Sequence, residues 1–351
     1  MLIDLDRPAE ARAMPAQPVV AIVGATGAVG VELLGCLESR KFPVKSLRLL
    51  ASARSAGRQM AFRGQQITVE ELTEASFDGV DIALFSAGSG LSKRFAPVAV
   101  RAGAVVVDNS SAFRMEAHVP LVVPEVNADA MAGHQGVIAN PNCVAAIATV
   151  ALAPLALQHR IKRLNLATYQ AASGAGAAAM EELRLATAAA LAGESYEPKV
   201  LPHPYAFNFF SHNAEMDPET GYNGEETKVV AETRRILGLP DLPIGITCIR
   251  VPILRAHGMA ISVQFDEAVS PEEARSLLEA APGIRVVDDR ARNHFPMPCE
   301  ASGQEDVLVG RIRTDIGDPL GRTLAMFVVG DQLLKGAAQN AVQIAEALLP
   351  R

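Results

Sequence analysis

The stretch Gly24-Ala25-Thr26-Gly27-Ala28-Val29-Gly30 decides the fold, because it joins two different sequence patterns. Before it, residues 18–23 form a short apolar run that is typical of a strand buried on both faces. After it, residues 31–39 favour a helix. Such a turn gathers backbone N–H groups at the positive end of a helix, and its glycines let a pyrophosphate approach the backbone. We therefore expect a dinucleotide-binding turn; the alternative is that the glycines only pack the helix on the strand.

The end of the second predicted strand indicates which dinucleotide is bound. An NAD site usually has an acidic residue there, whereas an NADP site tends to carry arginine. No acidic residue occurs from Lys45 to Arg63, and the segment offers Ser52, Arg54 and Ser55. Guanidinium and hydroxyl groups are good donors to a phosphate. The sequence therefore favours NADP over NAD, although an arginine in a solvated loop would look the same.

The rest of the chain predicts two domains. Short apolar runs alternate with helical patterns in the first part, at residues 47–50, 82–85, 91–101, 105–107 and 137–139. This alternation is typical of a parallel sheet covered by helices on both faces. The later part mixes patterns, with helices expected at 144–158 and 180–192, strands at 164–170 and 259–265, a long loop at 196–224 and a closing helix at 330–349.

We therefore predict an α/β protein with an N-terminal Rossmann-type domain and a C-terminal α+β catalytic and dimerisation domain. Residues 18–142 plus 331–351 form the first domain and residues 143–330 the second, after a flexible leader at 1–17. A chain of 351 residues is long enough for two cores.

Composition excludes several classes of protein. The net charge is −7 and there is no run of basic residues, so a nucleic-acid partner is not expected. No apolar stretch approaches the about 20 residues that span a bilayer, and the N-terminus lacks the pattern of a signal peptide. We expect a cytoplasmic protein with reduced cysteines and no metal site.

Cys143 is the candidate nucleophile. It follows Ile138-Ala-Asn-Pro-Asn142, which reads as a strand end and a tight turn before a helix. Backbone N–H groups and the helix dipole there favour the thiolate, and the same donors could hold an oxyanion. Cys36 and Cys248 lie within predicted elements and are expected to be inert packing residues.

His257 is the candidate for proton transfer, because it stands where a segment containing Pro252 passes into a strand. His203 and His212 lie in the expected long loop without acidic residues or thiols at metal-ligand spacing. We assign both to loop structure.

Taken together, these motifs resemble the aspartate-semialdehyde dehydrogenase family. The resemblance runs from about residue 19 to the C-terminus, in ordered blocks at 24–30, 51–57, 109–114, 140–143, 168–176, 250–257 and 336–346.

The resemblance implies a role for each matching residue. Cys143 would be the nucleophile, Gln170 would orient the thioacyl intermediate, and His257 would be the general acid/base. The expected substrate and phosphate residues are Arg250, Glu225, Lys228, Arg114, Asn109, Ser173 and Gly174. The expected cofactor residues are Gly24, Thr26, Gly27, Ala28, Val29, Gly30, Ser52, Arg54, Ser55, Ser86, Gly88 and Gln332.

Two of these assignments leave alternatives open. Gln332 stands where the family has asparagine, which puts its contact with the nicotinamide in doubt. Glu225 and Lys228, three residues apart, could equally be a solvated pair on a helix.

The implied activity is the reversible, NADPH-dependent reduction of L-aspartyl 4-phosphate to L-aspartate 4-semialdehyde through a cysteine thioester. It would serve the biosynthesis of lysine, threonine, methionine and diaminopimelate, in a homodimer or a dimer of such dimers. The alternatives are an N-acetyl-glutamyl-phosphate reductase and a catalytically silent relative that only binds NADPH. The presence of Cys143 argues against a silent relative.

Overall fold

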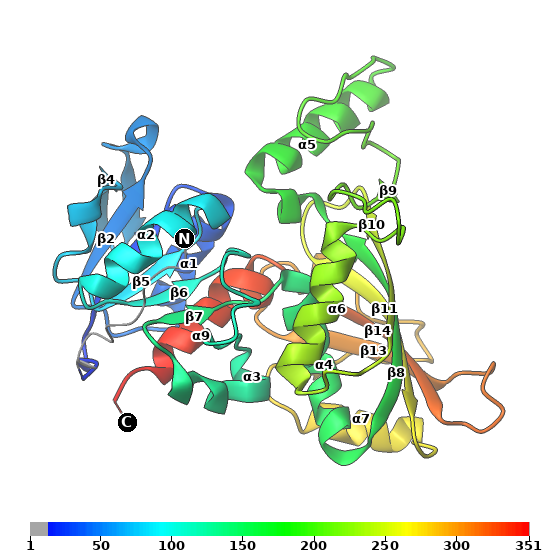
Figure 1. Ribbon diagram of the computed structural model, residues 1–351. Coiled ribbons are helices and arrows are strands. Elements are labelled where there is room, and N and C mark those ends of the chain that lie inside the picture. Colours follow the sequence, from blue (N-terminus) through cyan, green and yellow to red (C-terminus); the bar gives the residue numbers. More distant parts are fainter. Residues whose placement is uncertain (1–12, 351) are drawn as a thin grey trace. The chain divides into compact units, whose positions relative to one another are not determined.

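The computed structural model describes residues 13–350, which form two compact units (Figure 1). The first unit ends at Asn142 and resumes at Ala337, and the second runs from Cys143 to Gly336. The boundary at 336/337 lies a few residues beyond the predicted one at 330/331, because the side chains of Asp331 and Gln332 bond to residues of the second unit. Most of the predicted leader falls on residues 1–12, outside the described part of the chain.

The first unit is built on a seven-stranded sheet in the order β3-β4-β2-β1-β5-β6-β7. Its elements are β1 (Val19–Val23), α1 (Ala28–Ser39), β2 (Ser46–Ala51), η1 (Ala53–Ser55), β3 (Gln59–Phe62), β4 (Gln65–Glu71), η2 (Glu74–Phe77), β5 (Ile82–Phe85), α2 (Ser89–Arg101), β6 (Val105–Asp108), α3 (Pro124–Asn127), η3 (Ala128–Gly133), β7 (Val137–Ala139) and α9 (Gln339–Ala347). All its strand pairs are parallel except β3 with β4. The chain moves from β1 to β2 on one side and then returns to β5 on the other, which makes the β1 end a topological switch point.

The glycine-rich turn lies at that switch point, and its geometry requires glycine. Gly24 has φ +85°, and a Cβ atom on it would collide with the carbonyl group of Ser86. A Cβ atom on Gly30 would collide with the backbone of Gly24 and Ala25. Gly24 therefore permits the turn and Gly30 the close packing of α1 on it, as in a dinucleotide-binding fold.

The second unit contains a mixed sheet in the order β12-β13-β14-β11-β8-β10-β9. Its elements are α4 (Cys143–Gln158), β8 (Ile161–Gln170), η4 (Ala172–Ala175), α5 (Ala177–Leu191), β9 (Phe210–Ser211), α6 (Gly224–Leu237), β10 (Ile244–Arg250), β11 (His257–Phe265), α7 (Pro271–Glu279), β12 (Ile284–Val286), α8 (Pro298–Ala301), β13 (Val307–Thr314) and β14 (Thr323–Gly330). Helices α4, α6 and α7 lie along one side of this sheet (Figure 1). Together the two sheets confirm the predicted fold class.

Helix α4 is apolar on every side. All its residues from Val144 to Ala153 are buried, against α6, α7 and β14. A helix of this kind is held by the core and not by an amphipathic face. Among the described residues, neither α4 nor another helix has the length and apolar character needed to cross a membrane.

Strand ends converge at one edge of the second sheet. Parallel strands β8 and β10 end there, with Gln170 paired to Arg250. The antiparallel strand β11 begins there at His257, opposite Gly330 at the end of β14. The topology thus brings three of the candidate residues to a common edge.

The predicted closing helix at 330–349 is wrong in its first part. The chain first forms a turn and a π-helical segment, η5 (Leu334–Ala338), and the α-helix begins only at Gln339. The turn forms because Asp331 Oδ1 accepts the backbone N–H groups of Leu333 and Leu334. The predicted loop at 196–224 holds one short strand, β9.

Helix α6 begins with a capping box that fixes Glu225. The side chain of Asn223 accepts the N–H groups of Glu225 and Glu226, at 3.0 and 3.1 Å, while Glu226 Oε2 accepts the N–H of Asn223. Three donors that would otherwise lack partners are thereby satisfied.

We expect Asn223→Ala to lower the free energy of unfolding by about 1–2 kcal/mol, because helix α6 loses its cap at a position that is buried from solvent. Asn223→Ser is the matched control, since serine keeps an oxygen that can cap the helix. Urea denaturation followed by circular dichroism measures both variants. An unchanged midpoint for Asn223→Ala would contradict the proposed contribution of the cap.

Candidate active site

Cys143 is the first residue of α4 and carries a half-buried thiol that is in no disulfide. The backbone of Gly336 lies against it, since a Cβ atom on Gly336 would stand 2.7 Å from the Cβ of Cys143. A side chain at position 336 would therefore displace the cysteine. Of the other cysteines, Cys36 and Cys248 are buried, as expected of packing residues, and Cys299 is exposed.

His257 is fully buried and has a defined tautomer. Its Nδ1 accepts the backbone N–H of Ala171 at 3.1 Å, so the neutral ring carries its proton on Nε2. Nε2 has no hydrogen-bond partner among the described residues. Burial lowers the pKa of His257 well below its ordinary value, and the nearby Arg250 and His212 lower it further. The ring is therefore neutral at pH 7 and presents an N–H donor.

Arg250 places a cation beside this ring. It is 2% exposed, and its Nη1 donates to the carbonyl oxygen of Ala171 at 2.9 Å. Its Nη2 lies 2.7 Å from His212 Nε2 and donates to Asn213 Oδ1 at 3.2 Å, while Nε has no hydrogen-bond partner in the part of the chain that the structure describes. Burial lowers the pKa of Arg250, and the nearby acidic groups Tyr205 and Glu225 are among those that oppose this effect. A buried guanidinium with neutral hydrogen-bond partners is suited to receive a carboxylate.

Gly174 leaves the space between these two side chains open. A Cβ atom there would lie 3.1 Å from His257 Nε2 and 3.3 Å from Arg250 Nη1. A side chain at position 174 would thus occupy the place where a ligand could meet both groups.

Gln170 and Glu225 form a second buried contact at this edge. Gln170 Nε2 donates to Glu225 Oε1 at 3.1 Å, and Thr168 donates to Gln170 Oε1 at 3.0 Å. Both halves of the Gln170 amide are oriented by these bonds. Lys228 is exposed on the next turn of α6.

His212 is a residue that sequence reasoning missed. We assigned it to loop structure, yet its ring contacts Arg250. Burial lowers its pKa to about 4; Glu225 opposes this effect, whereas Arg250 and Lys228 add to it. His212 is therefore neutral at pH 7 and faces the guanidinium without repelling it. No sequence pattern distinguished it from His203, which packs edge-on against Phe210 as a loop residue.

The predicted cofactor residues of the first unit gather around its switch point. Thr26 in the glycine turn donates to Ser55 at 3.4 Å, which links the turn to the segment after β2. Ser86 follows β5 and donates its N–H to the carbonyl of Val23 at 2.8 Å. Ser52 and Arg54 are exposed at the same strand ends. The glycine turn, the helix N-terminus and the exposed arginine fit a dinucleotide phosphate.

Asn109 and Arg114, the predicted phosphate pair, are in contact within the first unit. Arg114 donates from Nη2 to the carbonyl oxygen of Asn109 at 2.8 Å and from Nε to that of Asn140 at 2.9 Å. Asn109 Oδ1 is buried without a hydrogen-bond partner among the described residues.

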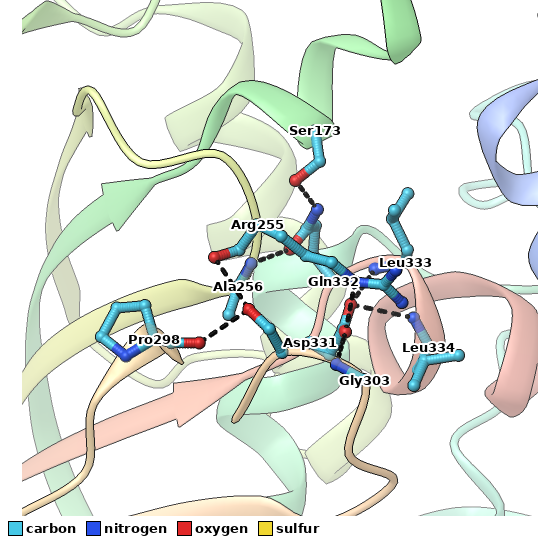
Figure 2. A network of polar contacts seen from close by, with 10 residues as sticks. Ser173, Arg255, Ala256, Pro298, Gly303, Asp331, Gln332, Leu333 and Leu334 are labelled. Carbon is cyan, nitrogen blue, oxygen red and sulfur yellow. Dashed lines mark hydrogen bonds and ion pairs between the residues drawn. The ribbon is translucent and has the colours of Figure 1, made fainter. Parts of the chain in front are cut away.

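Gln332 uses its amide inside the second unit. Oε1 accepts the N–H of Ala256 at 2.9 Å, and Nε2 donates to the hydroxyl of Ser173 (Figure 2). Within residues 13–350, no group of three or more His, Cys, Asp or Glu side chains is placed to hold a metal ion.

Comparison with known proteins shows the family of the chain. Residues 19–134 match the family "Semialdehyde dehydrogenase, NAD binding domain", and residues 152–335 match "Semialdehyde dehydrogenase, dimerisation domain". The aspartate-semialdehyde dehydrogenase of Synechocystis sp. is 51% identical over 338 residues, which cover 96% of this chain and 99% of that protein.

Two solved structures share the fold. Aspartate semialdehyde dehydrogenase II from Vibrio cholerae, in complex with ASA, is 42% identical with a TM-score of 0.91, covering 95% of this chain and 98% of that chain. The enzyme of Candida albicans with NADP is 25% identical with a TM-score of 0.73, covering 95% and 98%.

We expect iodoacetamide at pH 7 to modify Cys143 first. It is accessible at a helix N-terminus, whereas burial raises the pKa of Cys248 to about 12. Peptide mass spectrometry over a time course measures each site. Cys299 is the internal control, because it is an exposed thiol. Modification of Cys299 faster than Cys143 would contradict a reactive Cys143.

Proposed function

Because the chain belongs to the aspartate-semialdehyde dehydrogenase family, we propose that it interconverts L-aspartyl 4-phosphate and L-aspartate 4-semialdehyde with NADP. The observation that carries the proposal is the pairing of a neutral, buried His257, whose Nε2 has no hydrogen-bond partner within residues 13–350, with a buried Arg250. His257 can move a proton and Arg250 can hold a carboxylate. The space between the two side chains stays open because residue 174 is a glycine.

Cys143 would act as the nucleophile. In the reducing direction its thiolate attacks the acyl carbon of the substrate, a C–S bond forms, and the C–O bond to phosphate breaks with phosphate as the leaving group. Partial positive charge at the N-terminus of α4 supports the thiolate and the oxyanion of the tetrahedral intermediate. The bound nicotinamide would supply hydride to the thioester carbon in the reducing direction.

His257 would complete the reaction by proton transfer. In the reducing direction, addition of hydride would leave an oxyanion on the carbon bonded to Cys143, and the Nε2–H of the neutral ring would donate its proton toward that oxygen. The aldehyde would form when the C–S bond breaks and its electron pair leaves with the thiolate, and the proton shared with the oxygen would return to Nε2. The depressed pKa of His257 keeps the ring neutral, so it does not compete with Arg250 for the substrate carboxylate.

The remaining assigned residues would bind and orient. Arg250 would hold the α-carboxylate of the substrate, and Glu225 would accept a hydrogen bond from the amino group of the substrate. Gln170, fixed by Glu225 and Thr168, would orient the thioacyl group. Basic and amide side chains are proposed for the phosphate, namely Lys228, Arg114 and Asn109. Ser173 and Gly174 line the substrate space.

We assign the dinucleotide to the first unit. The turn from Gly24 to Gly30, with Ser86 and Gly88 after β5, would bind the pyrophosphate, and Ser52, Arg54 and Ser55 the 2′-phosphate of NADP. The related enzyme of Candida albicans, whose structure contains NADP, supports this choice.

The proposed organisation follows the family. Residues 18–142 plus 331–351 would bind the cofactor and residues 143–330 would catalyse and dimerise, which the match to a dimerisation domain supports. We propose a homodimer, able to pair into a dimer of dimers, that works in the cytoplasm. It would serve lysine, threonine, methionine and diaminopimelate synthesis.

We expect Cys143→Ala to lower kcat by at least about 10⁴-fold, as when other covalent nucleophiles are removed, with the Kd of NADPH within about twofold. The assay is phosphate-dependent reduction of NADP by aspartate semialdehyde, and Cys299→Ala is the matched control. N-Acetylglutamate semialdehyde is tested in parallel. Turnover by Cys143→Ala would refute covalent catalysis, and a preference for the acetylated substrate would refute the proposed substrate.

We expect Arg54→Ala to lower kcat/KM for NADP by about 10- to 100-fold and to leave kcat/KM for NAD unchanged, because charge-assisted bonds to the 2′-phosphate are lost. Arg101→Ala, at the far end of α2, is the control for net charge. Equal losses with both cofactors would contradict a role in phosphate recognition.

A further inference from the structure

Asp331 and Gln332 form the turn between β14 and η5, and this turn is rigidly held (Figure 2). Asp331 is fully buried, and its Oδ2 accepts from Arg255 Nε and from the N–H of Gly303, each at 2.6 Å. Its Oδ1 accepts from the N–H of Leu333 at 2.9 Å. The backbone of Gln332 is thereby fixed on both sides, and its side chain, 2% exposed, has little freedom.

The Gln332 amide connects the two segments that enclose His257. Oε1 accepts the N–H of Ala256, the residue before His257. Nε2 donates to Ser173, the residue before Gly174, whose hypothetical Cβ would touch the His257 ring. One side chain thus joins the segment that carries the imidazole, at Ala256, to the segment that lies over the ring, at Ser173.

The bond from the N–H of Ala256 to Gln332 contributes more to the local structure than a bond from an ordinary strand residue would. It has φ +70°, which is the left-handed region that alanine rarely adopts, and it is fully buried. A buried N–H without a partner is costly, and rotating the peptide would restore a partner. Such a rotation would turn the backbone of His257 and break the bond between its Nδ1 and Ala171.

We propose that Gln332 is a positioning residue for His257. Its Oε1 holds Ala256 in the left-handed conformation, so that Nδ1 of His257 meets Ala171 and the Nε2–H proton points toward the reacting atoms. Each half of the amide already has a partner within the second unit. The catalytic part of this inference rests on the proposed function, whereas the effect on the tautomer of His257 does not.

The test compares three variants in the full-length enzyme. Gln332→Leu keeps the approximate size and removes both hydrogen bonds. Gln332→Glu keeps an acceptor for Ala256 and can accept from the Ser173 hydroxyl. Ser302→Ala is the control: it loses bonds to the carbonyl oxygens of Arg255 and Pro298 in the same network, but none to Ala256 or Ser173.

We expect Gln332→Leu to lower kcat by about 10- to 100-fold, the cost of a misplaced acid/base, with KM for the semialdehyde and Kd for NADPH within about twofold. Gln332→Glu should recover most of kcat, and Ser302→Ala should retain it. An increased Kd for NADPH with unchanged kcat in Gln332→Leu would overturn the proposal and assign the residue to the cofactor.

A second readout does not depend on turnover. Nuclear magnetic resonance of ¹⁵N-histidine-labelled enzyme reports the tautomer of His257, with its signal assigned by loss in His257→Gln. We expect the Nε2–H form in the wild type and a mixture of tautomers in Gln332→Leu. An unchanged tautomer in Gln332→Leu would refute the positioning role. If the wild type lacks phosphate-dependent activity, the proposed function fails, whatever the tautomer experiment shows.

Discussion

The backbone of one residue, Ala171, connects the two groups on which the site depends. The N–H of Ala171 donates to His257 Nδ1, while the carbonyl oxygen of the same residue accepts from Arg250 Nη1. The imidazole and the guanidinium therefore cannot shift independently, and their separation is set by backbone geometry. Because main-chain groups have no rotamers to lose, this link positions two buried side chains with less loss of entropy than a bond between side chains. Burial then keeps the ring neutral beside the cation.

The sequence predicted the parts of the fold that local patterns encode. The buried strands at 82–85 and 137–139 and the glycine turn were recognisable because they combine an apolar run with a specific turn chemistry. The hairpin of β3 (Gln59–Phe62) and β4 (Gln65–Glu71) was not predicted, since its exposed edge carries polar residues with no strong alternation. Likewise, the π-helical segment Leu334–Ala338 follows from the tertiary contacts of Asp331, which no local pattern encodes.

The candidate site divides in the same way. Cys143 and His257 were predicted from their residue types and flanking motifs, and Arg250 from the family resemblance. His212 was missed, because its role comes from a loop folding back onto Arg250. Gln332 was placed at the cofactor by resemblance alone, and its bond to Ala256 could be found only from three-dimensional contacts. Sequence reasoning thus predicted the reactive groups, but not the contacts that hold them in place.

The construction of α4 ties the fate of the reactive sulfur to that of the hydrophobic core. Cys143 begins a helix whose following residues are buried on all sides. The backbone that carries the thiol is therefore part of the core and moves with it. Substitutions deep in this helix would act on catalysis as well as on stability. Heat inactivation and cooperative melting of the second unit should accordingly coincide, and loss-of-function alleles should be scattered through the interior as well as at the site.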